Sequence, residues 1–150
     1  MKKKKKEAVQ GFTLIEILVV MAVIGMTTWM SATFIKYQQP TIKLYTASQA
    51  LRSHIQKARQ YTLTNQITHA IHLSVAEESY ELVDLSGPTE LEAFTLPQNI
   101  EFGLITPFTD DQISFNAAGA ASQAGIIILE NSRGDSKTIT INPSGYIQVE

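Results

Sequence analysis

The sequence predicts an α+β protein in which a long N-terminal helix packs on a small antiparallel β-sheet domain. Three observations indicate this fold. Residues 12–35 form an apolar run of 24 residues with a single charge. Residues 36–64 continue with apolar side chains at helical spacing. Residues 65–150 contain short runs of alternating apolar and polar residues between turn residues, which is typical of antiparallel strands. The length of 150 residues suits one such domain.

A positively charged leader precedes the apolar run. Residues 2–6 are five consecutive lysines, and Lys and Arg hold their side of a membrane segment in the cytoplasm. A helix over residues 12–35 would be about 36 Å long, enough to cross a hydrocarbon core of about 30 Å. We therefore expect a single membrane-spanning helix with its N-terminus inside and the C-terminal domain outside.

Other kinds of N-terminal segment fit less well. A secretory signal peptide has an apolar region of about 7–15 residues and a cleavage site with paired small residues. This run is longer, and its last part, residues 27–35, contains Ser31 and Ala32 but no convincing pair of that kind. The chain has no Cys, which excludes a lipoprotein anchor. A plain signal anchor remains an alternative, because hydropathy alone does not separate it from a processed one.

Glu16 is the unusual residue of the apolar run. A carboxylate within a membrane helix costs roughly 2.5–3.5 kcal/mol, and such residues are usually paired and functional. The alternative is that Glu16 lies near the membrane interface and extends its carboxylate into water. We expect the functional role, because of the residues that surround it.

Residues 11–16 read Gly-Phe-Thr-Leu-Ile-Glu and resemble the processing motif of type IV prepilins and type II secretion pseudopilins. The resemblance implies that prepilin peptidase cuts between Gly11 and Phe12 and that Phe12 is N-methylated. It also implies that Glu16 pairs with the N-terminal ammonium of a neighbouring subunit during assembly. Because each buried charge is costly alone, a pair formed only between adjacent subunits would fix their register.

The same resemblance implies the partners and the location of the chain. The expected partners are prepilin peptidase, other pilin or pseudopilin subunits and the assembly platform, all at the inner membrane. The chain is expected to be a structural subunit rather than an enzyme and to need no cofactor. Without the leader, residues 12–150 hold 7 Lys and Arg against 13 Asp and Glu, a net charge near −6. Such an acidic domain is a poor partner for nucleic acid.

The segment 36–64 is expected to continue the helix into the globular domain. Residues 38–41, with Pro40, predict a break or kink at its start. An apolar stripe at three- and four-residue steps follows and is expected to pack on the sheet. The stripe consists of Leu44, Ala47, Ser48, Leu51, Ile55, Ala58 and Thr62.

The β region is expected to contain two hairpins and several shorter strands. The first hairpin joins residues 67–75 to 80–85, and the second joins 125–129 to 138–141. The other expected strands are 91–96, 100–104, 113–116 and 146–149.

The order of these elements resembles the H-type minor pseudopilin of type II secretion and related minor pilins. The resemblance includes Phe115 to Gly119, the run Ile139-Thr140-Ile141 and the run Gly145-Tyr146-Ile147. Some minor pilins of this group bind DNA through a basic segment near the C-terminus, so a DNA- or surface-binding minor pilin is the alternative function. Residues 145–148 contain no Arg, which weighs against DNA binding.

No residue pattern favours a metal site or an active site. His69 and His72 are three apart on an expected strand and point to opposite faces. His54 follows Ser53 on a helix, where neighbours in sequence do not face each other. Asp110 and Asp111 supply two carboxylates, which is few for a calcium site. We therefore expect no metal site. Besides a structural subunit and a DNA- or surface-binding minor pilin, a third hypothesis is a signal-anchored enzyme or receptor.

Overall fold

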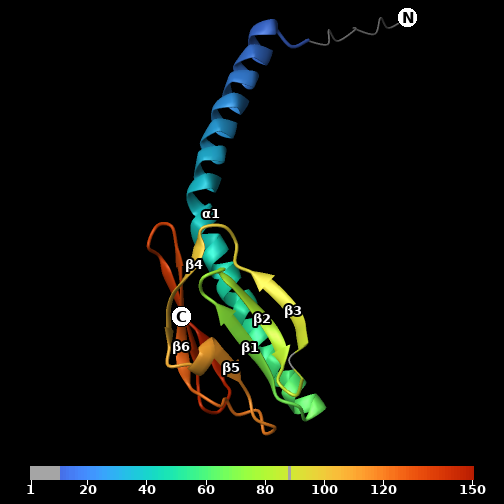
Figure 1. Cartoon of the computed structure of the whole chain (residues 1–150). Coiled ribbons are helices and arrows are strands. Elements are labelled where there is room, and N and C mark those ends of the chain that lie inside the picture. The colour runs from blue at the N-terminus through green and yellow to red at the C-terminus, as the bar shows by residue number, and fades with distance from the viewer. Residues whose placement is uncertain (1–10, 88) are drawn as a thin grey trace, which may run out of the picture. The chain divides into compact units, whose positions relative to one another are not determined.

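The computed structural model describes residues 11–150 except Pro88, and for residues 31–36 and Thr89 it describes the backbone alone. Residues 1–10 of the expected leader therefore lie outside the described residues. Two compact units divide the chain, residues 1–38 and residues 39–150, and each is described by itself. Figure 1 shows the elements of both units.

One helix, α1 (Leu14–Asn65), contributes to both units. The helix continues through Pro40, so of the predicted break or kink at residues 38–41 the break is wrong. A proline within a helix removes one backbone hydrogen bond. The turns that follow are held by buried side chains from Leu44 onward, which compensates for that loss.

In the first unit, the apolar side chains of α1 are exposed. Between Phe12 and Met30 the large apolar side chains are all more than half exposed in the single subunit. Among the described residues, no helix is both long and apolar enough to cross a membrane. The predicted span, residues 12–35, includes 31–35, whose side chains lie outside the described part of the structure.

In the second unit, α1 buries the predicted stripe. All seven residues of the stripe, which begins at Leu44 and ends at Thr62, are at most 3% exposed, which confirms the prediction that this face is buried. The end of the helix is tied to the next strand, because the Thr62 hydroxyl accepts a hydrogen bond of 2.9 Å from the backbone N–H of His69. The same hydroxyl donates to the carbonyl of Ala58 at 3.1 Å.

The predicted antiparallel β domain consists of two four-stranded sheets, a division that the sequence analysis does not specify. Sheet A has the order β3-β2-β1-β5, and sheet B has the order β4-β6-β7-β8. The strands of sheet A are β1 (His69–Ser74), β2 (Ser79–Asp84), β3 (Thr89–Thr95) and β5 (Gln112–Ser114). Those of sheet B are β4 (Ile100–Thr106), β6 (Gly125–Asn131), β7 (Ser136–Ile141) and β8 (Ile147–Val149).

The chain changes sheets between β3 and β4. Pro97 lies in this connection and has no N–H to continue a strand ladder, and Asn99 has a φ of 68°. As a result β4 pairs with β6 instead of β3. Both predicted hairpins are confirmed, as β1 with β2 and as β6 with β7.

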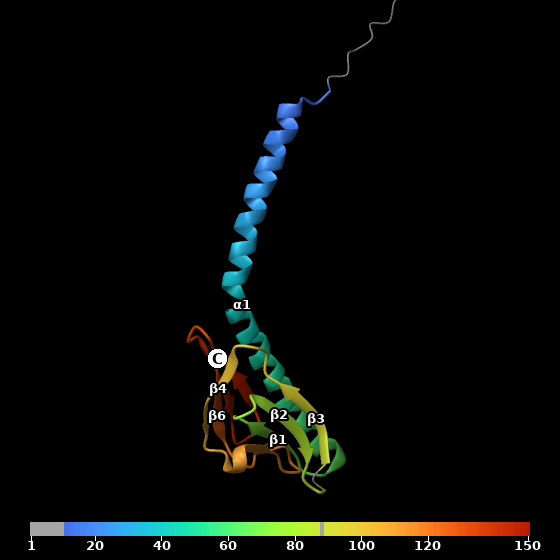
Figure 2. The same cartoon turned by 45° about the horizontal axis from the view of Figure 1, so that its top comes forward.

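One core joins α1 to both sheets. Phe115, Leu51, Ile71 and Ile127 are completely buried and belong to the same apolar cluster. In the two views of Figures 1 and 2, the second half of α1 lies against sheet A, whose strands β1, β2 and β3 cross it. The expected α+β architecture, with a helix on an antiparallel β domain, is therefore confirmed.

Gly119 and Gly145 lie in two loops that pack against Arg59 of α1. The side chain of Arg59 donates a hydrogen bond of 2.7 Å to the carbonyl of Gly119. Gly119 and Gly145 both have a φ of +78°, a conformation that favours glycine. A Cβ on Gly145 would collide with the carbonyl oxygen of Gly119, so these two turns pack backbone to backbone.

Glu78 connects the two sheets. It occupies the turn between β1 and β2, and its backbone carbonyl accepts a hydrogen bond of 2.8 Å from Leu96 at the end of β3. Its carboxylate accepts a hydrogen bond of 2.8 Å from the backbone N–H of Phe102 in β4. One residue therefore contacts both strands that flank the change of sheet.

Candidate functional site

The residues predicted to be processed lie together at the start of α1. Gly11, Phe12, Thr13 and Glu16 line one surface depression of about 490 Å³. Phe12 is 86% exposed, and no described atom lies within 4 Å of the position that a Cβ on Gly11 would occupy. The backbone around the Gly11–Phe12 bond is therefore accessible to another molecule in this subunit.

Glu16 and Thr13 form a reciprocal cap at the start of α1. The Glu16 carboxylate accepts hydrogen bonds of 2.9 Å from both the backbone N–H and the hydroxyl of Thr13. The backbone N–H of Glu16 in turn donates to the Thr13 hydroxyl at 3.3 Å. This is the geometry of a capping box, which satisfies N–H groups that have no partner within the helix.

The carboxylate is also favourably placed with respect to the helix as a whole. Glu16 lies in the first turn of α1, where the positive end of the helix dipole stabilises a negative charge. The arrangement therefore holds the Glu16 carboxylate close to Phe12, the residue that would become the new N-terminus after cleavage.

The sequence predicts roles for Gly11, Phe12 and Glu16, and the structure adds Thr13 beside them. The available signal was the pattern Thr-x-x-Glu directly before an apolar run, which is typical of a capping box. Within the Gly-Phe-Thr-Leu-Ile-Glu motif, Thr13 therefore has a physical role of its own: it binds the carboxylate of Glu16 within one subunit.

The three histidines lie in three different environments. His54 on α1 contacts Tyr80 and Phe94, whereas His69 lies edge-on to Tyr61. His72 lies on the outer face of sheet A beside Glu81. Within the described part of the chain, no group of three or more His, Asp or Glu side chains could hold a metal ion.

The two aspartates considered for calcium lie in a short 3₁₀ turn, η1 (Thr109–Asp111). Both have positive φ angles, 54° for Asp110 and 50° for Asp111. The turn is joined to a neighbouring loop, because Gln123 accepts from the Thr109 N–H and donates to its hydroxyl, each at 2.8 Å. These contacts hold Thr109 of the turn to the loop that contains Gln123.

A comparison with protein-family models matches residues 8–32 to the prokaryotic N-terminal methylation motif. The match includes all four residues of the depression at the start of α1. A comparison with curated proteins gave no match.

The fold is similar to two kinds of solved structure. The minor pseudopilin EpsH of the type 2 secretion system of Vibrio cholerae has a TM-score of 0.60 at 10% identity, covering 72% of this chain and 96% of that one. The type IV minor pilin FimU of Pseudomonas aeruginosa has a TM-score of 0.59 at 14% identity, covering 76% and 92%. A second crystal form of FimU gives 0.57 at 17% identity, covering 71% and 92%.

These scores are nearly equal, so the similarity extends to both kinds of subunit. The more specific resemblance to H-type minor pseudopilins stays a prediction. The prediction of a structural subunit rather than an enzyme agrees with the N-terminal motif and with the fold.

Proposed function

We propose that this pilin-like protein, whose N-terminal methylation motif and fold are those of type IV pilins and pseudopilins, is a minor structural subunit of a type IV pilus or of a type II secretion pseudopilus. The observation that carries the proposal is the arrangement at the start of α1. There the Gly11–Phe12 bond is exposed, and Glu16 lines the same depression.

Processing is the first step of the proposed function. Prepilin peptidase cuts between Gly11 and Phe12, and the new amine of Phe12 is methylated. The exposure of Phe12 and the free space around Gly11 support access by a membrane peptidase. The cut removes residues 1–11 and with them the five lysines that orient the precursor.

Membrane insertion is the second step. Residues 12–35 cross the inner membrane once, with the N-terminus on the cytoplasmic side and residues 65–150 outside. The exposed apolar side chains between Phe12 and Met30 support this role, because an apolar surface of that extent needs lipid or other helices to cover it. Residues 36–64 then connect the membrane segment to the β-rich domain.

Assembly is the third step and depends on Glu16. Before assembly, Thr13 satisfies the carboxylate within the same subunit. At the assembly platform, the ammonium of a neighbouring subunit's N-terminus offers a stronger, charged partner. Leaving one of these charges unpaired in an apolar environment is strongly unfavourable, so the pair favours one position of the incoming subunit.

Two variants and one mass measurement test this function. Mass spectrometry of the membrane-bound protein should find a chain that begins with N-methylated Phe12, and an intact Met1 in membranes would contradict the proposal. Glu16→Ala should leave cleavage intact but exclude the subunit from filaments. Normal incorporation of Glu16→Ala, judged against Ile17→Ala in the same helix, would refute the pairing step.

A further inference from the structure

The part of α1 that belongs to the second unit begins with a stretch that has no buried side chain. Residues 39–43 are exposed or half-buried, and Leu44 is the first side chain of this part that enters the core, at 2% exposure. Pro40 lies in the stretch and has no N–H to offer the carbonyl of residue 36. Segments with few buried contacts and missing hydrogen bonds open at low cost, so residues 39–43 are a weak point of the helix.

The turn between β6 and β7 contacts α1 at this weak point. The Thr41 hydroxyl accepts a hydrogen bond of 2.7 Å from Nη2 of Arg133 and donates one of 3.2 Å to Oδ2 of Asp135. The same Nη2 lies 3.3 Å from the same Oδ2. These three side chains form the helix–turn contact. In both Figure 1 and Figure 2 the orange-red loop that follows β6 lies beside α1.

The turn that supplies two of these side chains is itself held by hydrogen bonds. Asn131 is 7% exposed, and its side-chain oxygen accepts from the backbone N–H groups of Arg133 at 2.9 Å and of Asp135 at 3.0 Å. Its side-chain nitrogen donates to Oδ2 of Asp135 at 2.8 Å. The bonds from Asn131, then from Arg133 and Thr41, hold the pKa of Asp135 below its ordinary value. The turn therefore holds a charged donor and a charged acceptor in place for Thr41.

The contact joins parts of the chain that are far apart in sequence. Thr41 and Asp135 are 94 positions apart, and β6 and β7 are anchored in the core by Leu129 and Ile139, which are completely buried. Within the described stretch 39–43, Thr41 alone makes a side-chain hydrogen bond to the β domain. A firmly anchored turn thus restrains α1 ahead of the first helix residue that the core holds.

We propose that the helix–turn contact controls local unwinding of α1 at Pro40. While the contact is formed, the helix is continuous through Pro40. When it opens, residues 39–43 unwind and the core from Leu44 onward stays folded. The device gives α1 a place where its direction can change without loss of buried apolar contacts. It follows from the fold alone and depends neither on processing nor on assembly.

Hydrogen–deuterium exchange of the full chain in detergent tests the proposal. Thr41→Val removes the hydroxyl and keeps the shape of the side chain, and Thr and Val have nearly equal helix propensities. Exchange at the amides of residues 41–44 should accelerate about tenfold, because two hydrogen bonds to charged groups are lost. Exchange at residues 51–58, which lie on the buried part of α1, should stay as in the unmodified chain.

Two further threonine substitutions are the matched controls. Thr41→Ser keeps a hydroxyl at the contact and should exchange nearly as the unmodified chain does. Thr64→Val makes the same change on the same helix, where the hydroxyl accepts a hydrogen bond of 3.3 Å from Gln60. It should leave exchange at residues 41–44 unchanged.

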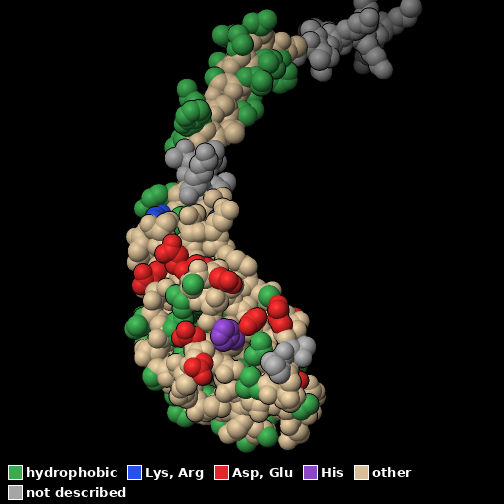
Figure 3. All heavy atoms as spheres, viewed as in Figure 1, with side chains coloured by type: hydrophobic (Ala, Val, Ile, Leu, Met, Phe, Trp, Pro, Cys, Tyr) green, Lys and Arg blue, Asp and Glu red, His purple; other side chains and the backbone are tan. Residues whose placement is uncertain are grey.

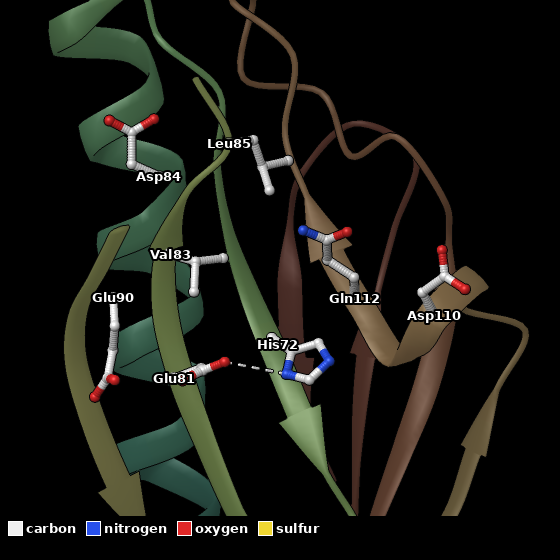
Figure 4. A pocket seen from close by; sticks show the side chains of 8 residues that line it. All are labelled: His72, Glu81, Val83, Asp84, Leu85, Glu90, Asp110 and Gln112. Carbon is white, nitrogen blue, oxygen red and sulfur yellow. Dashed lines mark ion pairs between the residues drawn. The ribbon is translucent and has the colours of Figure 1, made fainter. Parts of the chain in front are cut away.

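Arg133→Gln approaches the contact from the β domain. It should accelerate exchange at residues 41–44 as well, although it lies 92 positions from Thr41. Its control is Glu81→Gln, which breaks the ion pair of His72 and Glu81 at the same distance of 3.3 Å. That pair joins the neighbouring strands β1 and β2 (Figure 4), and Figure 3 shows a histidine among acidic side chains on the exposed surface. Exchange at residues 41–44 should not respond to Glu81→Gln.

The double variant Thr41→Val with Arg133→Gln should exchange no faster than Thr41→Val, because both changes remove one contact. Additive acceleration in the double variant would overturn the proposal. So would unchanged exchange in Thr41→Val, or an equal acceleration in Thr41→Ser. Acceleration at residues 51–58 to the same extent would mean that the whole domain is destabilised, which would also overturn the local role of the contact.

Discussion

The imidazole of His54 on α1 and the phenol of Tyr80 on β2 share a hydrogen bond of 2.9 Å, and the same imidazole stacks on the ring of Phe94 in β3 at a centroid distance of 3.8 Å. Tyr80 and Phe94 are themselves stacked at 5.3 Å. Three rings from three elements thus fix the side of α1 against sheet A. Burial raises the pKa of Tyr80 to about 12, so its phenol stays neutral over the physiological range.

His54 should make stability depend on mildly acidic pH. Burial, and then the positive charge of Lys57, lower the pKa of His54, whereas Glu92 opposes them in part. The unfolded chain then binds a proton more readily than the folded chain. This contribution to stability is present above about pH 6.5, the ordinary His value, and is lost as pH falls towards the lowered value.

The measurement is urea unfolding of the mature chain in detergent at pH 7.5 and pH 5.5. The unmodified chain should lose stability at the lower pH, and His54→Gln should show a smaller loss. His72→Gln, on the outer face of sheet A, is the comparison variant. An unchanged pH dependence in His54→Gln would contradict this role of His54.

Substitutions in the second half of α1 should destabilise the domain only on the side of the helix that carries the buried apolar stripe. Ile55 is completely buried, whereas Ile42 is 60% exposed in the same helix. Ile55→Ala should lower the free energy of unfolding by about 2–5 kcal/mol, since it removes buried methyl groups and leaves a cavity. Ile42→Ala, the same substitution, should change it by less than about 0.5 kcal/mol. Urea unfolding of both variants is the test, and equal losses would be inconsistent with the burial of this face.

Two glycine substitutions should separate the cost of a steric clash from the cost of a left-handed backbone conformation. Gly145 and Gly134 have nearly the same φ, +78° and +81°, but only Gly145 has a neighbour that a Cβ would strike. Gly134→Ala should cost about 1–2 kcal/mol for the left-handed conformation alone. Gly145→Ala should cost clearly more, because the Gly119 carbonyl must also move. Thermal unfolding of both variants measures the difference, and an equal cost would show that the turns can separate freely.

Thr13 should stabilise the first turn of α1. Thr13→Val removes the hydroxyl of the capping box, and loss of an N-cap costs about 0.5–2 kcal/mol. Amide hydrogen exchange in that turn should accelerate accordingly. Thr28→Val is the control, since the Thr28 hydroxyl donates within the helix to the Ile24 carbonyl at 2.8 Å. If exchange in the first turn is the same in both variants, the Thr13 cap does not form in detergent.

The sequence was informative where structure follows from local spacing. The stripe from Leu44 to Thr62 and the two hairpins depend on periods of 3.6 and 2 residues, which can be read in any window. Gly11, Phe12 and Glu16 could be predicted as candidate site residues because the motif is contiguous. The division into two sheets was missed because it depends on which distant strand β4 joins, and that choice is made by packing.

Contacts between residues far apart in the chain could not be predicted from the sequence either, because packing decides them as well. The partners of His54 lie on β2 and β3, at least 26 positions away in the chain. His72, Glu81 and Glu90 likewise lie near one another only because β1, β2 and β3 pair side by side. Thr13 is different, because its contact with Glu16 follows from a contiguous Thr-x-x-Glu pattern that the sequence shows directly.

Glu78 has a consequence for the solubility of the outer domain. β4 is an edge strand of sheet B, and exposed edge strands invite pairing with strands of other molecules. The Phe102 N–H on this edge is already bound by the Glu78 carboxylate. An intruding strand would have to displace a charged acceptor before it could extend the sheet. One side chain from a distant turn therefore protects this edge of sheet B against pairing with a strand of another molecule.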